Sequence, residues 1–389
     1  MVRVGFLMNL SENWMGGITY IRNLLYAINS LKIKEIEPVL FVQQDIDTKL
    51  RQDLSRLAKV VQVSFLSNKS TKRFIWKVME RITGSDFMVE LYLRKFKIDV
   101  FSHSKLVGLR NSKSINWIPD FQHKHLPHMF QENDIYLRNK GIAKYVKKSD
   151  CILLSSYDSL KDYKTFTANN HANVKVLHFV AQPGKSKSND AEELLRLKRK
   201  YEIEDDYFIL PSKLWKHKNH MVVFEALKIL KDKGRTPNLI CTGPLDDYRD
   251  VNYPNQLKQF LMDCGISVKL LGVIDFADLI VLMKNSIAVI NPSYFEGWST
   301  TVEECKSLGK NMILSNIDIH KEQNPSHSYY FDPNDPTELS RILEYHLENK
   351  KKVMKLYDER EYQEQLDKRT REFAEEYCSI IETVFKDSQ

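Results

Sequence analysis

Short apolar runs alternate with amphipathic stretches along the second half of the chain. The runs cover residues 208–214, 238–243, 268–272, 287–293 and 311–316. Their near-continuous apolar character is typical of parallel strands buried on both faces. Residues 221–233 place Val223, Leu227 and Leu230 on one helical face, and Gly234 provides a stop. The repeated β-α-β units predict a doubly wound parallel sheet, in which ligands bind at the carboxyl ends of the strands.

The first half follows the same α/β scheme less regularly and predicts a second domain of the same type. Its expected strands are residues 2–8, 39–42, 61–65, 114–118 and 151–155, with a helix from about Ile18. The polar stretch 184–190 leads into a charged helix at 191–200, so we predict domains at 1–188 and 189–365.

The end of the chain carries apolar residues at helical spacing and predicts a closing amphipathic helix at 366–386. The residues with this spacing are Leu366, Thr370, Phe373, Tyr377, Ile380 and Val384.

Composition adds few constraints beyond this two-domain scheme. The chain has 389 residues, 42% of them hydrophobic, and a net charge of +7 from interspersed Lys and Arg, which indicates anionic partners without naming them. Its 5 cysteines have no paired spacing, which argues against a disulfide framework or a zinc site. We therefore expect a reducing cytoplasm, and because no apolar run approaches about 20 residues, any membrane contact would be peripheral.

The segment 291–304 is the most informative stretch, because it runs from a strand end into a helix and carries Glu296 and Glu304 with seven residues between them. The first carboxylate would face the ligand crevice, and the second would accept two adjacent hydroxyls. The backbone amides of Gly297, Trp298, Ser299, Thr300 and Thr301 at the helix start would bind an anion or a sugar hydroxyl. A structural alternative stays open, in which Thr300 caps the helix and Glu303 reaches back to it.

Lys213 and Lys218 follow another predicted strand end just before a helix. Two ammonium groups there would neutralise a diphosphate and stabilise it as a leaving group. The alternative is a solvated basic loop.

Three features of the first half have weaker signals. Gly16 and Gly17 follow the first strand and would let a phosphate or sugar approach the backbone, although an ordinary turn needs glycine too. Asp120 and His123 lie past another strand end and could orient or polarise an acceptor hydroxyl, with His125 as a neighbouring imidazole. A lone histidine is more often structural.

The pair Asp45 and Asp47 has the spacing of a metal site that holds a diphosphate. Both residues also precede Thr48 at an expected helix start, and we favour a helix cap there. No other cluster has metal-ligand spacing, so we expect no metal and no cofactor.

Together these segments resemble the family 4 retaining glycosyltransferases of the GT-B fold, over nearly the whole chain. The pair Glu296 and Glu304 carries the resemblance, supported by Lys213 with Lys218, by Gly16-Gly17, by Leu271-Gly272-Val273 and by Phe331-Asp332-Pro333. The resemblance implies two facing Rossmann-like domains with parallel sheets and a last helix that crosses back to the first domain. It implies a nucleotide-diphosphate sugar, UDP- or GDP-linked, on the second domain and an acceptor on the first.

The same resemblance implies roles for single residues. Glu304 would hold the ribose hydroxyls, Glu296 with the following amides the donor sugar and phosphate, and Lys213 with Lys218 the diphosphate. Gly272 and Val273 would flank the base. A front-face route, in which a donor phosphate oxygen takes the acceptor proton, would keep the anomeric configuration.

This chain departs from the family pattern at two positions. It has Lys213 where the family has Arg, which removes a bidentate phosphate contact. It has Pro119-Asp120 where the family has a His-Asp pair, which leaves His123 as the candidate imidazole.

Residues 69–97 mix basic and aromatic side chains in a way that could lie on an anionic membrane surface, where a lipid-linked acceptor would fit. A solvated helix that covers the first sheet is the alternative.

Two rival functions remain at this stage. One is a nucleotide-sugar epimerase with the same donor pocket. The other is a non-catalytic basic protein that binds nucleic acid, against which no recognised nucleic-acid motif is present. We expect a hexosyltransferase for a surface glycan and no nucleic-acid partner.

Overall fold

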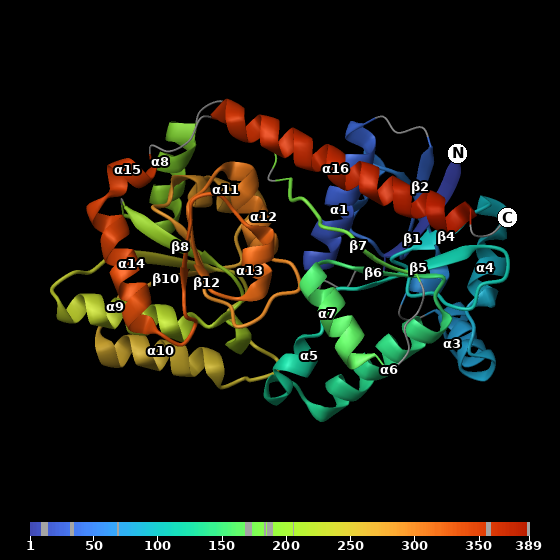
Figure 1. Ribbon diagram of the computed structural model, residues 1–389, viewed down its shortest axis with the longest axis horizontal. Helices are drawn as coiled ribbons and strands as arrows, with labels where there is room; N and C mark the ends of the chain where they lie inside the picture. Colours follow the sequence, from blue (N-terminus) through green and yellow to red (C-terminus); the bar gives the residue numbers. More distant parts are fainter. Residues whose placement is uncertain are drawn as a thin grey trace. The chain divides into compact units, whose positions relative to one another are not determined.

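The computed structural model describes residues 1–8, 15–31, 35–67, 70–167, 173–182, 184, 190–204, 206–354 and 359–386. The chain forms two compact units. Unit 1 comprises Met1–Phe121, Asn133–Ala181 and Asp367–Gln389, and unit 2 comprises Gln122–Glu132 and Gln182–Leu366. Each unit is a Rossmann-like α/β domain built on a parallel sheet (Figure 1), which confirms the predicted fold class.

Unit 1 contains a 7-stranded sheet of order β3-β2-β1-β4-β5-β6-β7 among the described residues. All its neighbouring strands run parallel. The strands are β1 (Val2–Met8), β2 (Ile36–Val42), β3 (Lys59–Gln62), β4 (Val100–Ser102), β5 (Lys113–Ile118), β6 (Cys151–Leu154) and β7 (Val174–Val176). The helices that belong mainly to this unit are α1 (Met15–Ser30), α2 (Thr48–Ser55), α3 (Thr71–Thr83), α4 (Phe87–Leu93), α6 (Glu132–Lys148) and α7 (Tyr157–Phe166).

Unit 2 contains a 6-stranded parallel sheet of order β10-β9-β8-β11-β12-β13 among its described residues. The strands are β8 (Tyr207–Pro211), β9 (Asn238–Thr242), β10 (Lys269–Gly272), β11 (Val289–Asn291), β12 (Met312–Ser315) and β13 (Ser328–Phe331). Its helices are α5 (Gln122–His125), α8 (Asp190–Tyr201), α9 (His220–Asp232), α10 (Tyr253–Cys264), α11 (Phe276–Asn285), α12 (Thr300–Leu308), α13 (Asp318–Gln323), α14 (Pro336–Glu348) and α15 (Lys350–Met354).

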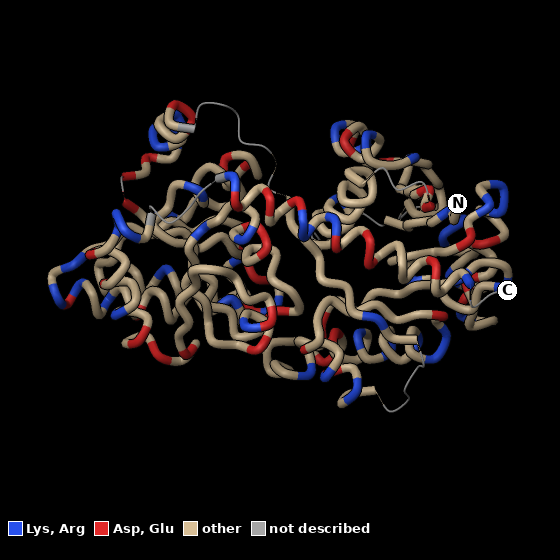
Figure 2. The backbone as a smooth tube through the Cα atoms, turned by 45° about the horizontal axis from the view of Figure 1, so that its top comes forward, with Lys and Arg blue, Asp and Glu red and all other residues tan. Residues whose placement is uncertain are grey.

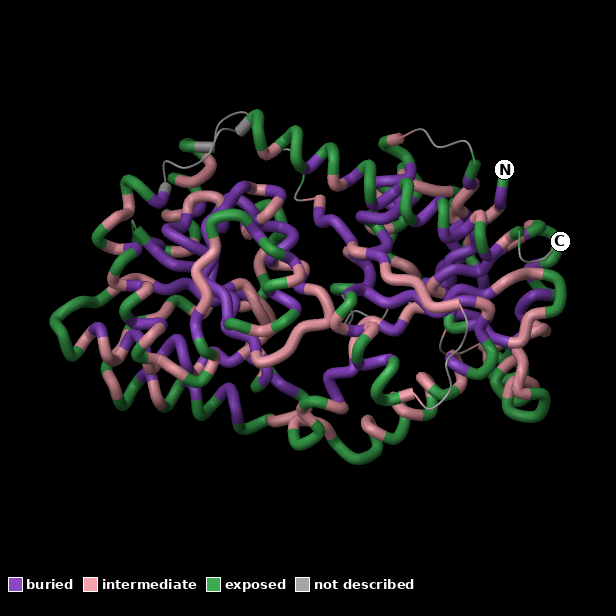
Figure 3. Tube along the Cα trace, viewed as in Figure 1, coloured by how far each residue is buried: buried purple, intermediate pink, exposed green. Residues whose placement is uncertain are grey.

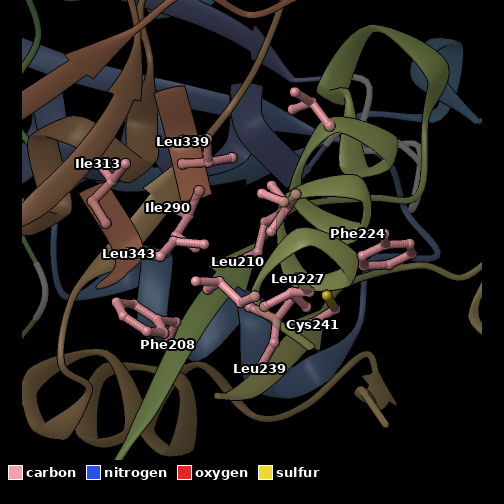
Figure 4. Close-up of a cluster of buried hydrophobic side chains, with 14 of the residues drawn as sticks. Phe208, Leu210, Phe224, Leu227, Leu239, Cys241, Ile290, Ile313, Leu339 and Leu343 are labelled. Carbon is pink, nitrogen blue, oxygen red and sulfur yellow. The ribbon is translucent and has the colours of Figure 1, made fainter. Parts of the chain in front are cut away.

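Alternate residues of β8 enter two different apolar clusters of unit 2. Phe208 and Leu210 pack in one cluster with α9 and α14, and Figure 4 shows Leu210 close to Leu227 of α9. Ile209 belongs to the second cluster, with residues of α11 and α12. Because successive strand residues point to opposite faces, both faces of this sheet are covered, as the run of apolar residues predicts.

The last helix, α16 (Glu359–Lys386), has most of its length in unit 1. Phe373 and Tyr377 are buried there, with ring centroids 6.4 Å from Tyr20 and 6.4 Å from Phe6, respectively. The apolar stripe predicted from the sequence is therefore the packing face of this helix, and Figure 3 shows buried and exposed residues alternating along it.

Several sequence predictions about the fold are wrong in detail. Strand β3 ends at Gln62, and Ser64–Leu66 form a short 3-10 helix, so the expected strand at 61–65 is displaced. Strands β4, β7 and β13 were not predicted, because runs of three or four residues have no clear periodicity. The expected linker at 184–190 lies almost entirely outside the described residues.

The cap interpretation of Asp47 is confirmed, because its carboxylate accepts a hydrogen bond from the Leu50 amide at 2.8 Å and starts α2. Asp45 accepts instead from the Ser67 hydroxyl at 3.2 Å.

Lys and Arg are interspersed with Asp and Glu along both units (Figure 2), as the sequence indicates. Among the described helices, none has the length and apolar character needed to cross a membrane.

Candidate active site

The loops at the carboxyl ends of the unit 2 strands contact one another. The amide of Leu214 after β8 donates to the Pro244 carbonyl after β9 at 3.0 Å. The amide of Tyr294 after β11 donates to the His217 carbonyl at 2.8 Å, and the Ser315 hydroxyl at the end of β12 donates to the Ser293 carbonyl at 2.6 Å. Since parallel strands end at the same edge, this is the edge at which a ligand is expected.

Lys218 and Glu296 meet at this edge, with Nζ and Oε1 2.6 Å apart. Their side chains keep 20% and 11% of their surface exposed, so the pair is largely withdrawn from water. The Ser293 hydroxyl also donates to Glu296 Oε1 at 2.7 Å. Burial alone would raise the pKa of Glu296, but the charge of Lys218 and these two hydrogen bonds hold it below its usual value. Glu296 is therefore an ionised acceptor.

Lys213 lies over the Trp215 ring, with Nζ 4.4 Å from the centroid. Burial lowers the pKa of Lys213, and the positive charges of Lys218 and Arg249 lower it further. A pKa depressed by neighbouring cations indicates that these groups share one region of positive potential. An anion bound there would relieve the repulsion and restore the charged form of Lys213.

Arg249, after β9, is a third cation of this region and was not predicted from the sequence. Its Nη2 lies 2.9 Å from His217 Nδ1, and its guanidinium lies 4.2 Å from the Trp215 centroid. Burial and the charges of Lys218 and Arg249 hold the pKa of His217 well below its usual value, so the imidazole is neutral and accepts from Arg249. The sequence signal that could have identified Arg249 is its position after β9, a strand that ends at the same edge of the sheet.

Arg249 also contacts the short segment Gln122–Glu132 of unit 2. Its Nη1 donates to Gln122 Oε1 at 3.3 Å, and its guanidinium lies 4.9 Å from the Phe130 centroid. The His125 ring of the same segment lies 5.1 Å from the Phe295 ring, next to Glu296. This segment therefore lies beside the site although it follows a strand of unit 1.

The amino end of α12 is fixed by side chains on both sides. The Ser299 hydroxyl caps the helix, accepting from the Val302 amide at 3.4 Å and from Asn291 Nδ2 at 2.9 Å. The alternative with Thr300 as the cap and Glu303 reaching back is therefore wrong. Glu303 instead accepts from Lys306 Nζ at 3.1 Å.

Gln323 forms hydrogen bonds with both the amide and the carbonyl of Ser299, and it was not predicted as a site residue. Its Oε1 accepts from the Ser299 amide at 3.1 Å, and its Nε2 donates to the Ser299 carbonyl at 3.0 Å and to Glu303 at 3.1 Å. Gln323 is 2% exposed, so these bonds are shielded from water and hold the amino end of α12 in one position.

Glu304 lies on the second turn of α12 and is 7% exposed. Its carboxyl group has no hydrogen bond or ion pair within the part of the chain that the structure describes. Burial raises the pKa of Glu304 to about 8. A buried carboxyl without a protein partner is costly and suits hydroxyl donors supplied by a ligand.

The remaining predicted residues divide between the units. Gly272 ends β10 with a left-handed φ of 68°, its carbonyl accepts from the Gly243 amide at 2.8 Å, and the following Val273 is 76% exposed. Gly16 and Gly17 lie in the first turn of α1 in unit 1. Outside this helix, no heavy atom of the described residues lies within 4 Å of the place that a Cβ of Gly16 would take.

Asp120 and His123 fall in different units. Asp120 of unit 1 forms an ion pair with Arg138 at 3.2 Å, whereas His123 of unit 2 is 1% exposed. Of the predicted site residues, the structure brings Lys213, Lys218 and Glu296 together beside the start of α12.

Gly243 packs directly under the Lys213 loop, and we predict that Gly243→Ala destabilises the fold. Its φ is 115°, and a Cβ there would lie 3.0 Å from the Ser212 carbonyl carbon. We expect a loss of about 2 kcal/mol in the free energy of unfolding, measured by denaturant titration. Gly234→Ala is the matched control, because its φ is also positive at 78° but nothing lies within 4 Å of its Cβ; equal losses would contradict a role for close packing.

Comparison with known proteins gives a family match for part of the chain and several similar folds. Residues 195–372 match the family model of glycosyl transferases group 1, which covers most of unit 2. A glycosyltransferase from Rickettsia africae ESF-5 superimposes with a TM-score of 0.65 at 16% identity, covering 99% of this chain and 98% of that chain. Anabaena HepE in complex with UDP and glucose gives a TM-score of 0.66 at 12% identity, covering 100% and 98%.

A sucrose-phosphate synthase from Thermosynechococcus elongatus is also similar, with a TM-score of 0.62, 11% identity and coverage of 100% of this chain and 97% of that chain. Among curated proteins, no sequence matches this chain. The fold of the chain is the GT-B fold of glycosyltransferases, and its second unit carries the group 1 glycosyltransferase match.

Proposed function

We propose that the protein is a retaining glycosyltransferase that moves a hexosyl group from a nucleotide-diphosphate sugar to a hydroxyl of a glycan or lipid-linked glycan. The observation that carries the proposal is the Lys218 and Glu296 pair, 2.6 Å apart, beside Lys213 and the capped end of α12. The complex of Anabaena HepE, a protein of similar fold, with UDP and glucose supports a UDP-linked donor.

The donor would be held by charge at one end and by hydroxyl recognition at the other. Lys213 and Lys218 would neutralise the diphosphate. The backbone amides at the start of α12, apart from the Ser299 amide that already donates to Gln323, would donate to phosphate or sugar oxygens. Glu304 would accept the ribose hydroxyls that its buried carboxyl lacks in the protein. Gly272 and Val273 would flank the base, where the exposed Val273 side chain offers an apolar contact.

In the transfer step, the acceptor oxygen bonds to the anomeric carbon while the bond from that carbon to the diphosphate oxygen breaks. The proton of the acceptor hydroxyl passes to a phosphate oxygen on the same face, so the anomeric configuration is kept. The two lysines stabilise the charge that develops on the leaving diphosphate. Because protein cations do this work, the proposal includes no metal ion and no cofactor.

Glu296 would bind a hydroxyl of the donor sugar in this step. Lys218 holds it ionised in the unliganded protein, and a sugar hydroxyl can replace one of these contacts when the donor binds. Asp120 and His123 stay candidates for orienting the acceptor. The five cysteines are free thiols, so we place the reaction in a reducing cytoplasm. We also assign the reaction to the synthesis of a surface polysaccharide.

A thermal-shift screen with UDP-, GDP-, ADP- and dTDP-sugars tests the donor assignment first, because a ligand that binds only the folded state raises the melting temperature. The selected donor, incubated with candidate glycan acceptors and followed by NMR of the anomeric proton, should then give product with the donor's configuration. Inverted product would overturn the retaining mechanism. Free epimer without transfer would favour an epimerase, and oligonucleotide binding without donor binding would favour a nucleic-acid protein.

A further inference from the structure

Helix α3 of unit 1 has no buried residue, although it is strongly amphipathic. Its large apolar side chains lie in water instead: Phe74 is 71% exposed, Ile75 54%, Val78 39% and Ile82 73%. A surface helix of a globular domain normally turns its apolar stripe to the core. An exposed apolar stripe of this size indicates an interaction surface.

Side chains on the opposite side of α3 contact the rest of unit 1. Trp76 Nε1 donates to Asp86 at 2.8 Å, and the Trp76 ring packs edge-on against Phe65 at 5.6 Å. Arg73 Nη1 donates to the Leu66 carbonyl at 3.0 Å, and Glu80 pairs with Lys144 of α6. These contacts fix the orientation of the helix.

The exposed residues therefore form one outward ridge. Phe74, Val78 and Ile82 are spaced by four residues, so at about 100° per residue they lie on one face over successive turns. The neighbouring helix α4 extends this surface, because its Leu91 and Tyr92 are 48% and 43% exposed. Figure 1 shows α3 and α4 next to each other at the same end of unit 1, and Lys72 of α3 lies 5.0 Å from the Tyr92 ring centroid.

The charges around this ridge have one sign. Its basic residues are Lys72, Lys77, Arg81, Arg94, Lys95 and Lys97, and all are exposed. Two acidic residues of the same stretch are buried: Asp86 is 1% exposed, and Glu90 is 6% exposed and accepts backbone amides. The third, Glu80, forms ion pairs with Lys77 and Lys144. An apolar ridge with a purely cationic surround is complementary to a bilayer that contains anionic lipid.

We propose that the outward faces of α3 and α4 dock the protein on an anionic membrane, with Phe74 and Ile82 inserted among the lipids and Lys72 and Arg81 at the headgroups. The docking surface concerns unit 1 alone and needs no nucleotide sugar. It deepens the proposed function in one respect, because a lipid-linked acceptor would be presented at the same surface, and that link rests on the proposed transfer reaction.

The test is sedimentation of the full-length protein with vesicles of phosphatidylcholine alone or with about 30 mol% phosphatidylglycerol. We expect binding only to the anionic vesicles, weakened by salt. Lys72→Gln together with Arg81→Gln should weaken binding about 25-fold, since each basic residue near the surface contributes about 1 kcal/mol. Phe74→Ser together with Ile82→Ser should abolish sedimentation at the same lipid concentration.

Matched controls come from other exposed residues of unit 1. Tyr136→Ser with Leu137→Ser removes apolar side chains of α6 that are 60% and 54% exposed, and Lys161→Gln with Lys164→Gln removes charges of α7; both should leave vesicle binding unchanged. Equal loss in the α3 and control variants would overturn the proposal. So would a wild-type dimer in solution that Phe74→Ser with Ile82→Ser converts to monomer, because the ridge would then be a contact between two copies.

The vesicle test separates this inference from the transfer reaction. Thermal stabilisation by the donor reports only unit 2 and should be unchanged in every α3 variant. Vesicle binding without donor binding would leave the docking surface intact and contradict the transferase. Donor binding without vesicle binding would contradict the docking surface and leave the proposed transferase intact.

Discussion

Lys218→Ala is expected to lower the rate of glycosyl transfer by about 100- to 1000-fold, the range seen when one preorganised group that stabilises a developing negative charge is removed. Two losses combine in this variant. The leaving diphosphate loses an ammonium group, and Glu296 loses the partner that lies 2.6 Å away and lowers its pKa. Initial rates at saturating donor measure the effect on kcat, and the donor Kd measures the effect on binding.

Lys216→Ala is the control for this prediction. Lys216 and Lys218 belong to one short 3-10 helix, Lys216–Lys218, but the Lys216 ammonium group lies 3.5 Å from Asp250. It should change the rate less than about threefold, because an exposed ion pair of this length contributes little. A comparable loss in both variants would show that the loop matters only for its overall charge, and would contradict a specific role for Lys218.

Donor affinity is expected to rise with pH up to about 8 and then to level off, because of Glu304. Burial raises the pKa of this carboxyl to about 8 in the free protein, so it is mostly protonated at neutral pH. Ribose hydroxyls that donate to the carboxylate would favour its ionised form and lower the pKa in the complex. Binding then releases a proton, and Kd should fall by up to about tenfold per pH unit below pH 8. Calorimetry with a UDP-sugar, whose diphosphate does not titrate in this range, measures the slope.

Glu304→Gln should flatten this pH profile and weaken the donor, while it stabilises the protein at high pH. The folded-state pKa lies above the unfolded value, so the stability associated with the protonated carboxyl is present at low pH and is lost as pH rises from about 4.5 to 8. The neutral amide does not titrate, and we expect it to raise the free energy of unfolding at pH 8 by on the order of 2 kcal/mol. If donor affinity and the free energy of unfolding change with pH in the same way in the wild-type protein and in Glu304→Gln, Glu304 is not the group that titrates with a pKa of about 8.

The sequence predicts the architecture well where periodicity is long and uniform. Strand β8 and helix α9 follow from the apolar run at 208–214 and the stripe of Val223, Leu227 and Leu230, because a sheet buried on both faces leaves that signature. Short strands such as β4 and β7, with three residues each, leave no such signature and are formed by pairing with longer neighbours.

The candidate site is predictable where chemistry follows a strand end, as for Lys218 and Glu296. Gln323 and Arg249 were missed because their roles depend on contacts between distant segments: Gln323 brackets Ser299 from α13, and Arg249 reaches the 122–132 segment. Thr300 was taken as the alternative cap because the capping pattern fits two adjacent hydroxyl residues. The Val302 amide, which donates to the Ser299 hydroxyl, shows that Ser299 occupies the position.

The most direct test of the account is calorimetric titration of the wild-type protein with the sugar nucleotide selected by thermal shift, repeated with Lys213→Ala, Lys218→Ala, Glu304→Gln and the double variant Lys213→Ala with Lys218→Ala. We predict one site per chain, a lower affinity in each single variant, and a double variant whose loss differs from the sum of the two lysine losses, because both ammonium groups act on one diphosphate. Unchanged affinity in all the variants would show that the nucleotide sugar binds elsewhere and would contradict the proposed function.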